Sequence, residues 1–164
     1  MRADLVYSFP TEDDWGPVAV ISEAREILPI IKLATVDSVT HRILLSQVWC
    51  CHELRGLVQS TALSAMVYTV PQVIGLKLAM PERPVVAFYG DAGFLMVVGK
   101  LSTFSNLGLS IIFITFVDSS LDIEVRVWVI NRSELRYALR IALRVDTFSV
   151  IAADIGVGGY DGRI

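Results

Sequence analysis

The stretch VVAFYGDAGF, residues 85–94, places an aspartate between two glycines directly after a compact apolar run. β-Branched and aromatic residues dominate that run, which is typical of a buried strand. Gly90 and Gly93 let the main chain approach another group closely, and Asp91 supplies a hard oxygen ligand. A bend alone requires no acid at this place. The stretch therefore predicts a strand end that binds a cation and a phosphate group.

A second strand with an acid at its end follows along the chain. We predict a helix over residues 93–107 and then a strand in SIIFITFV, residues 110–117, whose continuous apolar character indicates burial on both faces of a parallel sheet. A right-handed crossover through that helix brings both strand ends to one edge of the sheet, where ligands bind in α/β folds. We therefore expect Asp91 and Asp118 to converge there on one divalent cation.

The main-chain amides of Ala92 and Gly93 open the predicted helix and would favour a phosphate group beside the cation. The alternative is that the two acids only cap a turn and a strand end. The residues alone leave both interpretations open.

The rest of the chain alternates between predicted helices and strands. Further helices are expected over residues 15–28, 40–48, 62–79 and 133–145, further strands over 31–37, 125–130 and 148–155, and an irregular connection over 49–60. This alternation predicts an α/β fold, a three-layer Rossmann-like domain with a mostly parallel sheet. We interpret residues 1–13 as a lead-in or linker and residues 14–164 as one domain.

The helix expected over residues 133–145 is amphipathic, and it carries Arg136, Arg140 and Arg144 on the face opposite its leucines. We interpret this arginine face as solvated, with anion binding as the alternative.

Composition narrows the class of protein. A net charge of −3 and a pI of about 5.3 argue against nucleic acid as a partner. Charged residues make up 19% and the mean hydropathy is +0.58, but the longest uncharged run, residues 56–76, holds too many polar groups for a membrane span. The adjacent Cys50 and Cys51 suit neither a disulfide nor a zinc site. With no signal peptide at Met1, we expect a cytoplasmic protein.

The segment RPVVAFYGDAGFLMVVGKLSTFSNLGLSIIFITFVDSSL, residues 83–121, resembles the diphosphate-binding domain of acetolactate synthase-like thiamine-diphosphate enzymes. That family's motif reads GDG, then about two dozen residues, then NN. It corresponds here to Gly90-Asp91-Ala92 and to Val117-Asp118. Further stretches that share the resemblance are TVDSVTHRILLSQ (35–47), SAMVYTVPQVIGLKLAMPERP (64–84) and FSVIAADIGVGGYDGRI (148–164).

The resemblance implies thiamine diphosphate and Mg²⁺ as cofactors, with the thiazolium ylid carrying the chemistry. It implies that the carboxylates of Asp91 and Asp118 and the main-chain oxygen of Ser120 bind the metal. It also places Met66 near the aminopyrimidine. The implied cofactor-binding set is Gly90, Asp91, Ala92, Gly93, Met66, Asp118 and Ser120.

The implied function is that of the diphosphate-binding domain or subunit of a 2-oxoacid decarboxylase or carboligase. Turnover would require a separate pyrimidine-binding domain or subunit, in a homo- or hetero-oligomer. No catalytic residue is assigned, because the glutamate that assists cofactor deprotonation belongs to that other domain in the family.

The sequence departs from the family pattern at several places, among them Leu95 and Lys100, where relatives are often acidic. Val39 and Val67 stand where the family has glycine, and a valine adopts a positive φ only with strain. The link over residues 119–126 is too short for the expected crossover helix, so the domain is apparently shortened after residue 118, with the strand over 125–130 displaced or paired differently.

Two other functions stay open on these departures. The chain could be a truncated, non-catalytic relative that retains only the fold, or a small α/β regulatory or nucleotide-binding module. We interpret the isolated His41 and His52 as structural or surface residues, and GVGGYDG, residues 156–162, as a flexible tail rather than a nucleotide loop.

Overall fold

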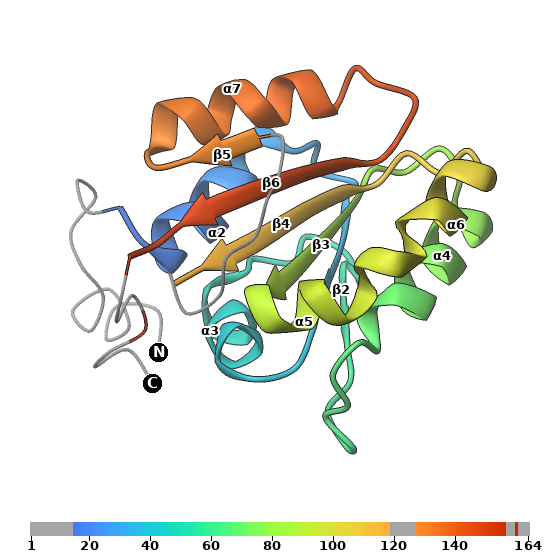
Figure 1. Ribbon diagram of the computed structural model, residues 1–164, viewed down its shortest axis with the longest axis horizontal. Helices are drawn as coiled ribbons and strands as arrows, with labels where there is room; N and C mark the ends of the chain where they lie inside the picture. Colours follow the sequence, from blue (N-terminus) through green and yellow to red (C-terminus); the bar gives the residue numbers. More distant parts are fainter. Residues whose placement is uncertain (1–14, 119–126, 157–159, 161–164) are drawn as a thin grey trace.

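A parallel sheet lies between two layers of helices in the computed structural model, which describes residues 15–118, 127–156 and 160 (Figure 1). In this part of the chain the strand order is β2-β1-β3-β4-β6-β5, and every neighbouring pair is parallel. This arrangement confirms the predicted α/β fold with three layers.

The sheet is most deeply buried at its centre. Its strands are β1 (Leu33–Val36), β2 (Leu57–Gln59), β3 (Val85–Gly90), β4 (Ile112–Val117), β5 (Val127–Val129) and β6 (Ser149–Asp154). Every residue of β4 is buried, and successive side chains point to opposite faces. Phe88 and Ile114 belong to one core cluster, whereas Tyr89 and Phe113 belong to the other. Two covered faces explain why these strands are apolar at nearly every position.

The two helical layers follow from these clusters. Helices α2 (Pro17–Ile27), α3 (Thr40–Val48) and α7 (Arg132–Ala142) cover one face, and α4 (Thr69–Ala79), α5 (Asp91–Val97), the 3₁₀ turn η1 (Val98–Lys100) and α6 (Leu101–Asn106) cover the other. The crossover from β3 through α5 and α6 to β4 is the predicted one, and it places the carboxyl ends of both strands at one edge (Figure 1).

Two predictions before β3 are wrong. The connection expected over 49–60 contains β2, which pairs in parallel with β1 at the edge of the sheet. The long helix expected over 62–79 begins only at Thr69, because Ser64 and Val67 have positive φ values of 46° and 71°, outside the helical region. Pro71 lies in the first turn of α4, where its missing N–H costs little.

The helix expected over 93–107 begins earlier and is interrupted. It begins at Asp91, directly after β3, and the 3₁₀ turn at Val98–Lys100 separates α5 from α6. Gly99 lies in that turn, where its low helix propensity favours the break.

The strand expected over 125–130 is present as β5. It pairs in parallel with β6 at the outer edge of the sheet, with Trp128 opposite Ala152. The short link over 119–126 lies outside the described residues, as does the lead-in over 1–13. Of the helices in the described part of the chain, none is both long and apolar enough to cross a bilayer.

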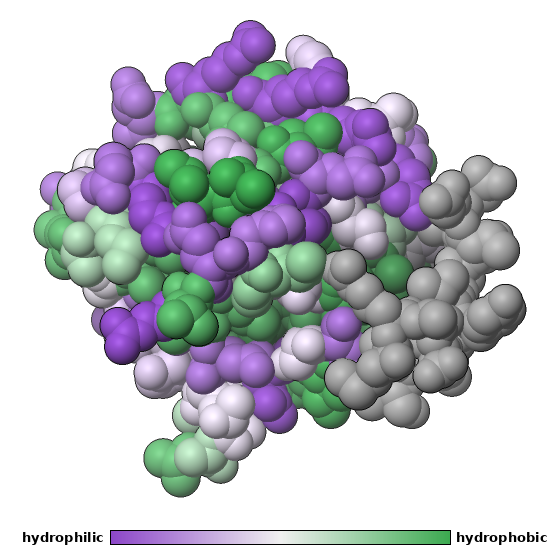
Figure 2. Space-filling view, turned by 180° about the vertical axis from the view of Figure 1, so that it is seen from behind, coloured by the Kyte–Doolittle hydropathy of each residue, from purple (hydrophilic) through white to green (hydrophobic). Residues whose placement is uncertain are grey.

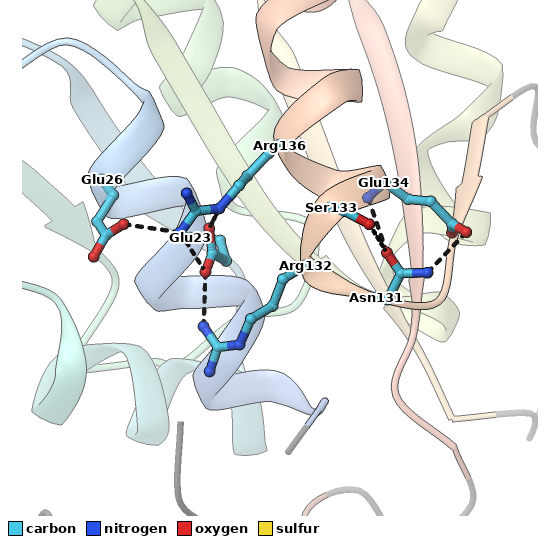
Figure 3. A network of polar contacts seen from close by, with 7 residues as sticks. All are labelled: Glu23, Glu26, Asn131, Arg132, Ser133, Glu134 and Arg136. Carbon is cyan, nitrogen blue, oxygen red and sulfur yellow. Dashed lines mark hydrogen bonds and ion pairs between the residues drawn. The ribbon is translucent and has the colours of Figure 1, made fainter. Parts of the chain in front are cut away.

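An ion-pair network joins α2 to α7 (Figure 3). Glu23 is only 2% exposed, and it accepts hydrogen bonds from Arg132, at 2.8 Å, and from Arg136. Arg136 also pairs with the exposed Glu26 at 3.2 Å. The arginine face is therefore not wholly solvated as predicted, because one of its residues anchors the helix. At the start of α7, the side chain of Asn131 accepts from the N–H of Glu134 and caps the helix.

Candidate functional site

A pocket opens at the carboxyl edge of the sheet, where β1, β3 and β4 end. Its lining residues are Asp37, Ser38, Val39, Thr40, His41, Met66, Gly90, Asp91, Ala92, Gly93, Phe116, Asp118 and Tyr160. Six of the seven sequence-predicted cofactor residues lie on this one pocket. The seventh, Ser120, is outside the described residues.

The two predicted metal-binding carboxylates converge here. Asp91 begins α5 after β3, and Asp118 follows the neighbouring strand β4, which pairs with β3 up to Gly90 opposite Phe116. Burial raises the pKa of the Tyr160 phenol, and the charges of Asp118 and Asp91 raise it further, so both carboxylates lie near that hydroxyl. The pocket edge is therefore electronegative and can attract a cation.

A cation at this edge would need ligands beyond these two side chains. Across the described ranges, no group of three or more His, Cys, Asp or Glu side chains is placed to hold a metal ion. Carboxylate oxygens suit Mg²⁺, which usually takes one or two carboxylates and completes its octahedron with phosphate oxygens and water. The donor set of Asp91 and Asp118 therefore fits a metal that is bound together with an anionic ligand.

The glycines of the opening stretch face protein side chains as well as the pocket. A Cβ added at Gly93 would lie 2.7 Å from Oδ2 of Asp37, and one added at Gly90 would lie 3.2 Å from Cε1 of His41. Both distances are shorter than an ordinary van der Waals contact. The close approach predicted for these glycines is real, and the partners that require it are Asp37 and His41.

Asp37 is a buried carboxylate in the wall of the pocket. It is 1% exposed, and its Oδ2 accepts from the N–H of Val67 at 3.0 Å. Burial raises the pKa of Asp37, and the main-chain N–H groups of Val67, Ser38 and Thr69 oppose that rise. Its buried Oδ1 has no hydrogen-bond partner within the described chain.

His41 lines the pocket from the first turn of α3. Burial, with a smaller contribution from the charge of Arg42, lowers the pKa of His41 to about 4, so the imidazole is neutral at pH 7. Its buried Nε2 has no partner among the described residues. The structural role predicted for His41 is consistent with this burial, but its place at the pocket was missed because a single histidine carries no spacing signal.

Tyr160 is a second pocket residue that the sequence analysis missed. Its ring packs edge-on against Phe116 with centroids 6.3 Å apart, and its buried hydroxyl has no partner in the described part of the chain. The interpretation of residues 156–162 as a flexible tail is wrong for Tyr160, whereas 157–159 and 161–162 lie outside the described residues. Nothing in the local sequence distinguishes this tyrosine from a surface one.

The two valines at glycine positions are held in the left-handed region. Val39 has φ 88° and Val67 has φ 71°, a conformation that glycine adopts freely and a β-branched residue adopts only with strain. The strain expected from the sequence is therefore present at both places. Each costs on the order of 1–3 kcal/mol, and such strain clusters at functional sites.

Replacing Val39 by Gly should raise the free energy of unfolding by about 0.5–1 kcal/mol, because relief of the strain outweighs the added entropy of the unfolded chain. The Val39 side chain is 54% exposed, so little buried area is lost. Val98 is similarly exposed but has φ −53°, so Val98→Gly should destabilise the protein. Urea unfolding of both variants measures the two changes in the free energy of unfolding. A loss of stability in Val39→Gly would show that the backbone at Val39 is not strained.

A parallel α/β domain with two carboxylates and close-packed glycines at one carboxyl edge defines a class. It is the class of α/β domains whose ligands bind at the carboxyl ends of parallel strands. Comparisons with known proteins narrow it further. Residues 37–128 match the family model described as thiamine pyrophosphate enzyme, C-terminal TPP binding domain.

The chain is similar to two acetolactate synthase large subunits. It is 30% identical over 155 residues to that of Parasynechococcus marenigrum, covering 92% of this chain and 24% of the relative. It is 26% identical over 156 residues to that of Lactococcus lactis, covering 95% of this chain and 27% of the relative. The chain thus spans about a quarter of the length of these curated relatives.

The fold is also similar to an X-ray structure from Mycobacterium smegmatis, of a protein assigned as a thiamin diphosphate-dependent enzyme. The TM-score is 0.73 at 17% identity, and the match covers 87% of this chain and 32% of the other. The chain therefore belongs to the family of C-terminal TPP-binding domains of thiamine pyrophosphate enzymes.

Proposed function

We propose that this chain binds thiamine diphosphate through Mg²⁺ in the pocket at the carboxyl edge of the sheet. The observation that carries the proposal is the convergence of Asp91 and Asp118 on that pocket. Two carboxylates beside an anionic ligand repel it unless a cation lies between them, so affinity depends on the metal. Membership of the family supports thiamine diphosphate as the ligand.

In this proposal, different residues bind the diphosphate end and the aminopyrimidine end of the cofactor. Asp91 and Asp118 bind Mg²⁺ with the main-chain oxygen of Ser120, and diphosphate oxygens and water complete the coordination. The N–H of Gly93 then faces the diphosphate. The N–H of Ala92 donates to Oδ1 of its neighbour Asp91 at 2.7 Å, so it has to be shared with the ligand.

The aminopyrimidine end lies on the side of Met66, which lines the same pocket and is 39% exposed. When bound, the cofactor supplies the carbon nucleophile for reactions of 2-oxoacids. The residues of this chain bind and orient it and exclude water, and no acid or base for the reaction is assigned to them. We propose a decarboxylase or carboligase as the whole activity, because the named relatives are acetolactate synthases.

A partner domain that binds the pyrimidine would complete the site. Large apolar side chains are exposed near the pocket, among them Val39 and Met66 on its lining and Met96 in α5, which is 62% exposed. The loop between β2 and α4 protrudes from the body with an apolar tip, where Leu63 is 89% exposed (Figure 2). Exposed large apolar side chains of this kind are typical of an interface. We propose that this surface is covered in a homo- or hetero-oligomer.

The second candidate function is a relative that binds cofactor weakly or not at all and retains only the fold. Val39 and Val67 favour it, because both bear side chains and strain where the family has glycine. Turnover of a 2-oxoacid by the chain together with a pyrimidine-binding partner would exclude this candidate.

Calorimetric titration of thiamine diphosphate into the chain tests the proposal, once with Mg²⁺ and once with a chelator. Saturable binding that requires Mg²⁺ is the expected result. ATP serves as the competing ligand: binding of ATP without any binding of thiamine diphosphate, with or without partner, would reject the proposal in favour of a nucleotide-binding module.

A further inference from the structure

Two segments that form one wall of the pocket are joined by side chain to main chain hydrogen bonds. The hydroxyl of Ser38 donates to the carbonyl oxygen of Ala65 at 3.0 Å, and the N–H of Val67 donates to Oδ2 of Asp37 at 3.0 Å. We call these four residues the clamp. Met66 lies between the two clamped residues of the second segment, so the main chain is fixed on both sides of it.

The clamp holds a conformation that the chain would otherwise leave. Val67 has φ 71°, and a left-handed conformation costs a residue with a Cβ roughly 1–2 kcal/mol. A valine released from its hydrogen bond would relax to negative φ and carry Met66 with it. The hydrogen bond to Asp37 and the packing of the Val67 side chain against the core cluster of α4 and α5 prevent this.

Asp37 is itself held rigidly enough to serve as an anchor. It is buried at the carboxyl end of β1, and its Oδ2 lies so close to α5 that a Cβ at position 93 would be 2.7 Å from it. Ser38 is 4% exposed, so its hydroxyl does not exchange its partner for bulk water. The hydrogen bonds of the clamp therefore fix the position of Met66 relative to the end of β1.

We propose that Asp37 and Ser38 are positioning residues that fix Met66 against the ring end of the bound cofactor. This inference rests on the proposed function, and it separates the two ends of the site. Asp91 and Asp118 determine the affinity for the diphosphate, whereas the clamp acts on the aminopyrimidine ring through Met66.

The test is calorimetry of the 164-residue chain with Mg²⁺, using thiamine diphosphate and inorganic pyrophosphate as separate ligands. Ser38→Ala and Asp37→Ala should each weaken thiamine diphosphate about tenfold relative to pyrophosphate, the loss expected from one or two hydrogen bonds. Ser46→Ala is the matched control, because its hydroxyl bonds Arg42 and Gln59 in the same region, away from the pocket.

Relief of the backbone strain at position 67 should restore most of the thiamine diphosphate affinity that is lost in Asp37→Ala. In a Val67→Gly background the left-handed conformation costs nothing, so Asp37→Ala should weaken thiamine diphosphate only about twofold to threefold. A merely structural role of Asp37 would give the same loss in both backgrounds. Ser38→Ala keeps the test decisive if Asp37→Ala does not fold.

A readout without cofactor separates this inference from the proposed function. The chain has four methionines, so the ε-methyl NMR resonance of Met66 can be assigned with Met66→Leu. That resonance should shift in Ser38→Ala and stay in place in Ser46→Ala. If thiamine diphosphate does not bind to the unmodified chain, with or without partner, the proposed function fails and the Met66 resonance alone decides whether the clamp positions Met66. An unshifted resonance, or thiamine diphosphate affinity within twofold of the unmodified chain in both clamp variants, overturns the positioning role.

Discussion

Replacing Asp91 by Asn should lower the affinity for thiamine diphosphate in the presence of Mg²⁺ by at least about 100-fold. Mutation of a residue that hydrogen-bonds to a metal ligand typically lowers metal affinity or activity about 10–100-fold. Loss of a charged ligand itself should lower the affinity further. Asparagine retains an oxygen that can accept the N–H of Ala92, so the local fold is preserved. Calorimetry at fixed Mg²⁺ measures the change.

Two further variants make this result specific. Asp154 also ends a strand at this edge of the sheet but does not line the pocket, so Asp154→Asn should leave the affinity within about threefold. Asp118→Asn introduces the residue that the family motif carries and removes one negative charge. The variant should therefore still bind thiamine diphosphate, and its affinity should depend less on Mg²⁺. Equal losses in all three variants would indicate a general charge effect instead of metal ligation.

Replacing Glu23 by Gln should cost about 2–3 kcal/mol of unfolding free energy, below the 3–5 kcal/mol usual for breaking a buried pair, because the two arginines can turn to solvent. Glu23 is 2% exposed and joins α2 to α7 through Arg132 and Arg136 (Figure 3). Glu26→Gln is the matched control, because the Glu26 side chain is 66% exposed and its ion pair with Arg136 lies at the surface, so its loss should stay within about 0.5 kcal/mol.

The stability that Glu23 provides should depend on pH in a definite direction. Burial alone would raise the pKa of Glu23, but the hydrogen bonds and charges of Arg136 and Arg132 hold it below the ordinary value of 4.5. A carboxyl group whose pKa is lower in the folded chain than in the unfolded chain stabilises the fold at pH values above its unfolded pKa. This stabilisation is lost as the pH falls. The difference between the unmodified chain and Glu23→Gln in urea should therefore shrink below about pH 4.5. A difference that grows on acidification would contradict the ion-pair assignment.

The sequence predicted the elements whose signals are local. Continuous apolar runs identified β3 and β4 because both faces of the sheet are covered, and the acids at their ends identified the pocket because parallel strands end at one edge. The glycine positions at Val39 and Val67 likewise predicted strain, and the structure has both at positive φ.

The errors concern features that depend on distant contacts. Strand β2 has three residues and exists because β1 offers it an edge, which no local pattern encodes. The pairing of Arg136 with Glu23 joins helices over 100 residues apart in sequence. Tyr160 becomes a pocket residue only through packing. Asp37 was overlooked, although it ends the strand predicted over 31–37 as Asp91 follows β3.

The most direct test of the account is crystallographic. Crystals of the chain grown with thiamine diphosphate and Mn²⁺ in place of Mg²⁺ should show an anomalous peak within about 2.5 Å of carboxylate oxygens of both Asp91 and Asp118. Oxygens of the diphosphate should coordinate the same Mn²⁺ ion. Bound thiamine diphosphate with the metal elsewhere, or with the two carboxylates turned away from it, would contradict the proposal that these acids hold the cofactor through one cation.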